Sequence, residues 1–346
     1  MPTRSRRILA VAALCASLAA PSAPLAQSAR ERLPREVFDV IAPPDRIEGR
    51  RGSYRIIQQG CLVGPLGPHT RRRIVDLAAQ EWAVFGFQSL DYATTESRTL
   101  PRADGLQIIP DALNPPLSAP RLARRTMRLG RWEDESAVLA TVAGYWSATP
   151  DGAAVIEKQN RVWNSWFGED VGWVEPWSAA FVSWVMCEAG LGEPATFQRS
   201  IAHWEYVDQA IRARDSAALL PSAYVARDWG EAPVNPGDLL CSSRGDADYR
   251  TLEDRRPHLG VYAPLHCDVV VKVDPAQGVI FVIGGNVLNS VSLSALKAEV
   301  STTGLTPSPE ARVPGARRWF AHLQLRTGAI EAEALDHSPT IAALQR

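Results

Sequence analysis

Residues 175–184 read EPWSAAFVSW, and they place one hydroxyl, that of Ser178, where an apolar helical segment begins. Proline is favoured at the start of a helix, where Pro176 stands, and glycine just past its end, where Gly190 stands. The stretch therefore predicts a helix over 177–189. Apolar side chains cover most of its surface, which indicates a buried helix. These side chains are Phe181, Val182, Trp184 and Val185.

A hydroxyl in the first turn of a buried helix can be a helix cap or a nucleophile. The first turn offers unpaired backbone N–H groups and the positive end of the helix dipole, and both can stabilise a developing oxyanion. The dipole contributes only about 0.3–1 kcal/mol, less than one pKa unit, so a serine also needs a positioned base. The alternative is that Ser178 caps the helix and has no chemical role.

His266 is the histidine that we expect to serve as this base. It opens the strand-like run HCDVVVKV, and a titratable side chain at the start of a strand can point into a cleft. Asp268 stands two residues further on, so it shares the face of His266. Asn286 follows the next predicted strand, in VIGGNV. Either Asp268 or Asn286 could orient the imidazole as the third member of a catalytic triad.

Three other polar or aromatic residues are candidates for substrate contact. Ser200 and His203, in the sequence SIAH, are one turn apart in a helix predicted over 197–214, so their side chains share a face. The alternative for both is a solvated helix face. Trp177 precedes the candidate nucleophile and is expected at the cleft, where an indole can stack on sugar rings or peptides. The alternative for Trp177 is a place in the core.

Metal and cofactor chemistry are not expected. His266, Cys267 and Asp268, together with Cys241, could suggest a zinc site. However, the sequence offers no Cys-x-x-Cys pair and no second histidine at ligand spacing, so we expect no metal. Nothing in the sequence implies a cofactor.

Four motifs follow one another along the second half of the chain. They are PWSAAFVSWVMCEAGLG (176–192), PGDLLC (236–241), HCDVVVKV (266–273) and VIGGNVLNSVSL (282–293). In this order they resemble the papain-like cell-wall amidases and peptidases of the NlpC and CHAP type. That superfamily carries Trp-Cys-Ala-Ala-Phe at its nucleophile, Pro-Gly-Asp at the start of a strand, a histidine opening the next strand and, in some branches, Gly-Gly-Asn. The chain resembles in particular an uncharacterised bacterial family, domain of unknown function 2272, whose members likewise show serine at the nucleophile position.

The resemblance covers about residues 130–326 and implies a papain-like α+β core with helices packed on an antiparallel sheet. It implies Ser178 in the nucleophile position, His266 as the base, and Asn286 or Asp268 as the orienting group. The chain departs from the superfamily by carrying serine where cysteine is usual, which puts the cysteine mechanism in doubt and leaves the fold unaffected.

The expected function is an exported hydrolase that cuts amide bonds, with peptidoglycan stem peptides as the substrate. Ser178 would attack, His266 would move the proton, and the Ser178 backbone N–H would help form the oxyanion hole. The first alternative is a catalytically inactive protein that binds peptidoglycan or cell-wall peptides through the same cleft. The second is a structural envelope protein that acts through the segment 27–68.

Composition and the N-terminus narrow the class of protein. The 346 residues are 46% hydrophobic with a net charge of −1, and they contain no basic stripe with interleaved aromatics, so nucleic-acid binding is not expected. Residues 1–26 combine early arginines with a short apolar run and small residues, which predicts a secretory signal peptide. Lipidation at Cys15 is the alternative, and Leu14 disfavours it. No later run of 18 apolar residues predicts a membrane span, so we expect a periplasmic or secreted protein.

The rest of the chain divides into three parts. Residues 27–68 are expected to form an extended arm or small subdomain, residues 69–326 the α+β domain, and residues 327–346 a disordered tail. Helices are predicted over 70–88 and 133–150, with a long proline-rich loop between them. Strands are predicted in a later group, which favours an α+β fold over a doubly wound sheet. These strand segments are 235–243, 258–273, 278–283 and 318–325, with a hairpin loop at 274–278.

Removal of the signal peptide leaves four cysteines, an even number that fits an oxidising compartment. We expect Cys241 to pair with Cys267, because both lie in strand-like runs that could be neighbours in one sheet. Cys61 and Cys187 are then left to pair with each other. The alternative is four buried thiols.

Overall fold

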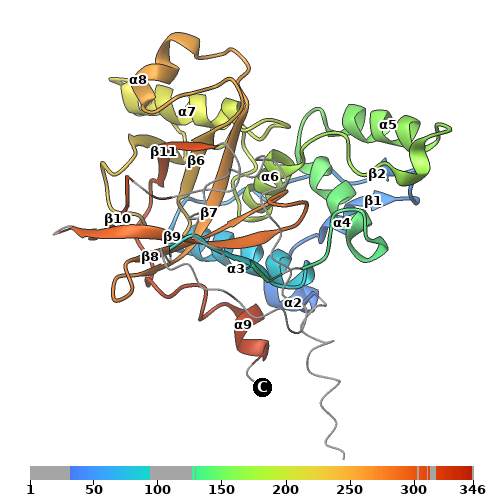
Figure 1. Ribbon diagram of the computed structural model, residues 1–346, viewed down its shortest axis with the longest axis horizontal. Coiled ribbons are helices and arrows are strands. Elements are labelled where there is room, and N and C mark those ends of the chain that lie inside the picture. The colour runs from blue at the N-terminus through green and yellow to red at the C-terminus, as the bar shows by residue number, and fades with distance from the viewer. Residues whose placement is uncertain are drawn as a thin grey trace, which may run out of the picture.

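The computed structural model describes residues 32–93, 127–128, 130–301, 304–309, 311 and 317–344. In these ranges a mixed, mainly antiparallel sheet packs against helices, which confirms the α+β class (Figure 1). The predicted signal peptide and most of the predicted proline-rich loop lie outside the described residues. No helix in the described ranges is long and apolar enough to cross a membrane.

Most of the helices come earlier in the chain than most of the strands of the main sheet. The helices are α2 Arg35–Phe38, α3 Pro68–Val84, α4 Ser136–Tyr145, α5 Gly152–Trp163, α6 Ser178–Glu188, α7 Trp204–Asp215, α8 Leu252–Arg255 and α9 Pro339–Leu344, with 3-10 turns η1 Pro43–Arg46, η2 Trp146–Ala148, η3 Gly168–Asp170 and η4 Arg256–His258. The strands are β1 Ile47–Glu48, β2 Arg55–Ile56, β3 Gln88–Asp91, β4 Met127–Arg128, β5 Tyr224–Asp228, β6 Leu239–Ser243, β7 Leu265–Asp274, β8 Val279–Gly284, β9 Ser292–Ser301, β10 Gly304–Pro307 and β11 Arg318–Leu325.

The main sheet has the order β4-β3-β9-β8-β7-β6-β11-β5, with β10 paired to β9. The pairing of β3 with β9 is parallel, and the other pairs are antiparallel. β7 and β8 form the hairpin that the turn residues at 274–278 predicted. β1 and β2 form a separate two-stranded sheet.

The helix predicted over 177–189 is α6, and every one of its residues is buried. It packs against β7 on one side and against α4 and η2 on the other (Figure 1). Gly190, just after the helix, has a φ of +96°, a left-handed conformation that glycine adopts without a steric penalty. The apolar surface seen in the sequence is thus explained by burial from both sides.

The helix predicted over 197–214 starts later than expected, at Trp204. The reason is a buried hydroxyl on α6. Ser183 Oγ donates to the Ser200 carbonyl at 3.0 Å and accepts from the Ser200 N–H at 3.1 Å, so the Ser200 backbone is bonded to α6. Residues 198–203 are therefore held against α6 as irregular chain, and the last of them is His203.

Both expected disulfides are present. Cys241 and Cys267 are directly opposite each other in the β6–β7 pair, and their sulfur atoms are bonded. Cys61 and Cys187 form the second bridge, which joins the N-terminal segment to α6 across 126 residues of sequence. Two disulfides fit an oxidising compartment.

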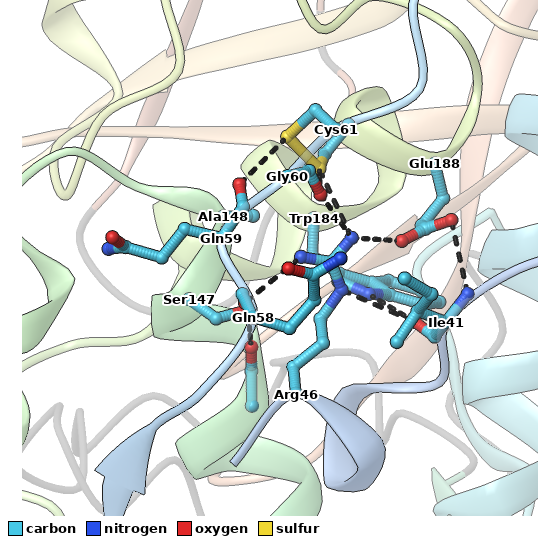
Figure 2. A network of polar contacts seen from close by, with 12 residues as sticks. Ile41, Arg46, Gln58, Gln59, Gly60, Cys61, Ser147, Ala148, Trp184 and Glu188 are labelled. Atoms are coloured by element: carbon cyan, nitrogen blue, oxygen red, sulfur yellow. Dashed lines mark hydrogen bonds and ion pairs between the residues drawn. A yellow bond between two sulfur atoms is a disulfide. The ribbon is translucent and has the colours of Figure 1, made fainter.

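The segment before α3 is held to the helices by a buried arginine. Arg46 donates to the carbonyl of Gly60 at 2.9 Å and to that of Ile41 at 3.3 Å, and it forms an ion pair with Glu188 of α6 (Figure 2). Trp184 of α6 also donates to the Ile41 carbonyl, at 3.4 Å. Residues 32–67, the described part of the expected arm, are thus held against the domain by these contacts with α6.

The C-terminal tail is ordered as far as Leu344, in contrast to the disorder that we expected. β7 continues past the first residue of β6, so its last residues have no strand partner on that side. Residues of the tail take this place: Val273 N–H donates to the Ala332 carbonyl at 2.9 Å, and Leu335 N–H to the Val271 carbonyl at 3.0 Å. The unused backbone groups of β7 explain why the tail is ordered.

Candidate active site

Ser178 and His203 form a polar contact at the N-terminus of α6. The hydroxyl oxygen of Ser178, the first residue of the helix, lies 2.7 Å from Nε2 of His203, the residue that precedes α7. Ser178 is 2% exposed and His203 is 3% exposed. The fold therefore places a hydroxyl and an imidazole in hydrogen-bond contact with little access for water.

Both residues line one cavity of about 300 Å³. Its wall is built by the entry to α6, the start of α7 and the turn before β7. The remaining lining residues are Trp146, Asp151, Val155, Glu175, Pro176, Ala179, Ile201, Ala202, Trp204, Glu205, Arg244, Tyr262, Ala263, Pro264 and Leu265. The Ser178–His203 pair is thus at the wall of a space that could hold a small part of a ligand.

The second nitrogen of His203 shows where the ring carries its proton. The backbone N–H of Cys267 lies 3.2 Å from Nδ1, and the Tyr206 hydroxyl also contacts Nδ1. A backbone N–H can only donate, so Nδ1 accepts, and in a neutral ring the proton is then on Nε2. His203 therefore donates to the oxygen of Ser178 and does not accept its proton in this arrangement.

His203 is neutral at physiological pH. Burial, followed by the positive charge that His266, Arg244 and Arg317 can carry nearby, holds the pKa of His203 well below its ordinary value. A neutral ring is consistent with a donor at Nε2 and an acceptor at Nδ1.

His266 and Asp268 form a second buried pair beside the first. His266 Nε2 lies 2.7 Å from Oδ1 of Asp268, and the ring centres of His266 and His203 are 5.1 Å apart. Burial lowers the pKa of His266 to about 4, although Asp268 acts in the opposite direction. Burial also opposes ionisation of Asp268, yet His266 and Arg317 outweigh it and lower the pKa of the carboxyl group. At neutral pH the pair is an ionised carboxylate that accepts from a neutral imidazole, which leaves Nδ1 of His266 unprotonated.

Two consecutive glycines at the end of the neighbouring strand β8 make room for this pair and for α6. A Cβ atom on Gly284 would lie 1.8 Å from Oδ1 of Asp268, so the carboxylate packs directly on that backbone. A Cβ atom on Gly285 would lie 2.5 Å from Cβ of Phe181, so this glycine lets α6 approach the sheet. The Gly-Gly sequence thus brings the carboxylate and α6 together at one place.

The structure brings together some of the predicted residues and separates others. Asp268, and not Asn286, bonds the His266 imidazole among the described residues. Asn286 has a left-handed φ of +55°, which is typical of a turn residue. Ser178 and His266, expected in contact, have different hydrogen-bond partners, His203 and Asp268.

The substrate-contact candidates also differ from expectation. Trp177 is fully buried and stacks with Phe85 and Tyr145, and its Nε1 donates to Glu133 at 2.6 Å. Its indole is therefore in the core and not at the cleft, because the chain turns it inward just before α6. Ser200 is buried as well, and its hydroxyl donates to Glu205.

Two residues of the site were not recognised in the sequence. Tyr206 follows His203 by three positions, a spacing that places side chains together on a helix and could have indicated the contact. Arg244 comes directly after β6, and nothing in the local sequence marks it as part of the cavity. Cys241 and Cys267, for which a zinc site was considered and not expected, have their sulfur atoms bonded to each other in a disulfide.

One protein family matches this chain. Its sequence model, described as an uncharacterized protein conserved in bacteria (DUF2272), matches residues 133–325, which is more than half of the chain. The matched range contains the Ser178–His203 and His266–Asp268 pairs. Comparisons with curated proteins and with solved structures found no match.

Proposed function

This chain belongs to the bacterial DUF2272 family, and we propose that it is an exported hydrolase of amide bonds with a papain-like core. Its substrate would be the stem peptides of peptidoglycan. The observation that carries the proposal is the contact of the Ser178 hydroxyl with an imidazole at the wall of a cavity. The two disulfides support export to an oxidising compartment.

Ser178 is the nucleophile in this proposal because of its place in α6. As the first helical residue, it lies among backbone N–H groups that have no acceptor within the helix. Ala179 lines the same cavity. The N–H groups of Ser178 and Ala179 would donate to the oxyanion that forms when the hydroxyl attacks an amide carbonyl.

The two histidines have different tasks in this proposal. His203 donates from Nε2, so it holds the Ser178 oxygen and stabilises negative charge on it. His266 has its proton fixed on Nε2 by Asp268, so its Nδ1 is the available base. Transfer of the Ser178 proton to His266 requires the hydroxyl to turn from its present contact toward the neighbouring ring.

The reaction would run in two stages. Ser178 Oγ bonds to the amide carbon while its proton moves to His266, and the C–N bond then breaks as the leaving amine takes that proton. Water next attacks the acyl-serine and gives one proton to His266, which returns it to Ser178 Oγ as the acid leaves. Protons and bonds balance with no further reactant.

A protein that binds cell-wall peptides without cleaving them is the second candidate. It is favoured by the direction of the His203 hydrogen bond, since a hydroxyl that accepts from an imidazole is not being deprotonated by it. The low exposure of both residues favours it as well.

The test is digestion of purified peptidoglycan with the wild-type protein, Ser178→Ala and the control Ser147→Ala. Ser147 is a buried hydroxyl of η2 that donates to the Gly144 carbonyl of α4 and does not line the cavity, so its replacement by alanine makes the same chemical change away from the site. We expect new amino groups, measured by mass spectrometry, with the wild type and the control but not with Ser178→Ala. Equal products from all three proteins would rule out Ser178 as the nucleophile, and binding without products would favour the second candidate.

A further inference from the structure

Arg244 is a half-buried cation on the wall of the cavity that contains Ser178. It comes directly after β6, and its backbone N–H donates to the Pro264 carbonyl at 3.0 Å. This bond holds Arg244 beside the start of β7, where His266 lies. The fold therefore fixes the position of this arginine next to the candidate site.

The guanidinium of Arg244 differs from those of three fully buried arginines in its lack of a carboxylate partner among the described residues. Arg46, Arg71 and Arg255 each form an ion pair with a buried carboxylate. Within the ranges that the structure describes, no side chain or backbone group forms a hydrogen bond or ion pair with the Arg244 guanidinium. A partly desolvated charge without a counter-ion is costly, so it marks a place where an anionic ligand would be favoured.

The pKa shifts at and around Arg244 are consistent with a charged guanidinium at the wall of the cavity. Burial lowers the pKa of Arg244, yet a guanidinium stays charged at any physiological pH. Arg244 is also among the groups that lower the pKa values of His203 and His266, so its charge acts on both imidazoles. An anion bound to Arg244 would lie close to the reacting groups.

We propose that Arg244 binds a carboxylate of the substrate, so that the site takes peptides with a free carboxylate next to the amide bond. The planar guanidinium matches a carboxylate with two parallel hydrogen bonds, which makes the contact directional as well as strong. Cleavage of such peptides rests on the proposed function, whereas their binding to Arg244 does not depend on it.

The other charges of the cavity set the direction in which such a ligand binds. Asp151, Glu175 and Glu205 also line it, and Glu175 is paired with Lys158. These carboxylates repel a ligand carboxylate. The anionic end of the ligand is therefore directed to Arg244.

The test compares two peptides that differ in one group, N-acetyl-alanyl-alanine and its C-terminal amide. Binding is measured by calorimetry and by the change in total tryptophan fluorescence, to which Trp146 and Trp204 of the cavity wall contribute. We expect the wild type to bind the acid about tenfold to a hundredfold more tightly than the amide, the range for a charge-assisted contact. Arg244→Gln should remove this preference, and Arg244→Lys should keep part of it.

Arg212→Gln is the matched control, because Arg212 is an exposed arginine that lines a neighbouring cavity of about 430 Å³. It should keep the full preference for the acid. Circular dichroism of each variant shows whether it is folded. Equal affinities of the wild type for acid and amide, or binding of neither, would overturn the carboxylate site. A clear preference for the acid without any hydrolysis would leave the site standing and overturn the proposed function alone.

Discussion

The Ser178 hydroxyl oxygen lies 2.7 Å from Nε2 of His203, between the first turn of α6 and the residue that precedes α7. His266, the histidine that we expected as the base, instead bonds Asp268 and lies beside His203 with a ring separation of 5.1 Å. The site therefore contains two neutral imidazoles, each protonated on Nε2. His203 donates this proton toward the Ser178 hydroxyl oxygen, whereas His266 donates it to Asp268 and has an unprotonated Nδ1.

Replacing Ser178 by cysteine should retain or increase amide hydrolysis. The first turn of α6 and a neighbouring imidazole both favour a thiolate, which is a stronger nucleophile than a serine hydroxyl. The measurement is the initial rate of amine release from peptidoglycan peptides by Ser178→Cys and by wild type. If Ser178→Cys stays folded and is as inactive as Ser178→Ala, the surrounding groups do not form a working site.

Replacing Asp268 by asparagine should slow hydrolysis by about a hundredfold or more and move the acid limb of the pH profile. The carboxylate holds the proton of His266 on Nε2, and its loss removes that orientation. In the wild type, His266 must be unprotonated, so kcat/KM should rise through pH about 4 and level off toward neutrality. Asp268 raises the pKa of His266, so its removal should shift this limb to lower pH.

Asp91→Asn is the control for that experiment, since Asp91 ends β3 and does not line the cavity. It should leave both the rate and the acid limb unchanged. If the acid limb of the pH profile does not move in Asp268→Asn, a group other than His266 is responsible for that limb.

The free energy of unfolding should fall as the pH is lowered from about 6.5 to about 4. The folded-state pKa of His266 is about 4, below the value of 6.5 for an unfolded histidine. Between these values the unfolded chain binds more protons, so acid favours unfolding, and the effect levels off below the folded pKa. Full burial of the ring gives an upper limit of about 3 kcal/mol.

The measurement is urea unfolding at a series of pH values with wild type and His266→Gln. The variant should lose part of the pH dependence, and His337→Gln, an exposed histidine, should not. Identical pH dependence in wild type and His266→Gln would contradict the lowered pKa.

Replacing Asp208 by asparagine should destabilise the fold by about 3–5 kcal/mol, because it leaves a buried arginine without its counter-ion. Asp208 of α7 binds Arg255 through both carboxylate oxygens, at 2.8 and 2.9 Å, and both side chains are fully buried. The measurement is chemical unfolding against Glu157→Gln, which breaks an exposed pair with Arg161. The control should change stability by less than about 1 kcal/mol, and a similarly small effect in Asp208→Asn would show that the buried pair is dispensable.

The local parts of the fold were predictable from the sequence. The apolar surface and the flanking Pro176 and Gly190 predicted α6, and the turn residues at 274–278 predicted the β7–β8 hairpin. The pairing of Cys241 with Cys267 followed from two strand-like runs. Each of these features depends on a short segment and its side-chain period, which the sequence displays directly.

The site was predictable only in part. Ser178, His203, His266 and Asp268 were all recognised as candidates, and Asp268 was expected as one of two possible partners of His266, with Asn286 as the other; the structure shows Asp268 in contact. The partner of Ser178 did not follow, because the expected helix over 197–214 would have placed His203 on a regular face. Ser183 bonds the Ser200 backbone instead, and this contact between distant segments sets where α7 begins.

By itself, the sequence indicated the α+β class, the buried helix that presents Ser178 and the pairing of Cys241 with Cys267, since these depend on local periodicity and on strands that are close in sequence. Only the tertiary structure decided that His203 meets Ser178, that Trp177 lies in the core and that Arg244 lines the cavity. The physical reason is that such contacts join segments that are far apart along the chain. Their geometry depends on how α6, α7 and β7 pack together, and no short stretch of sequence encodes that packing.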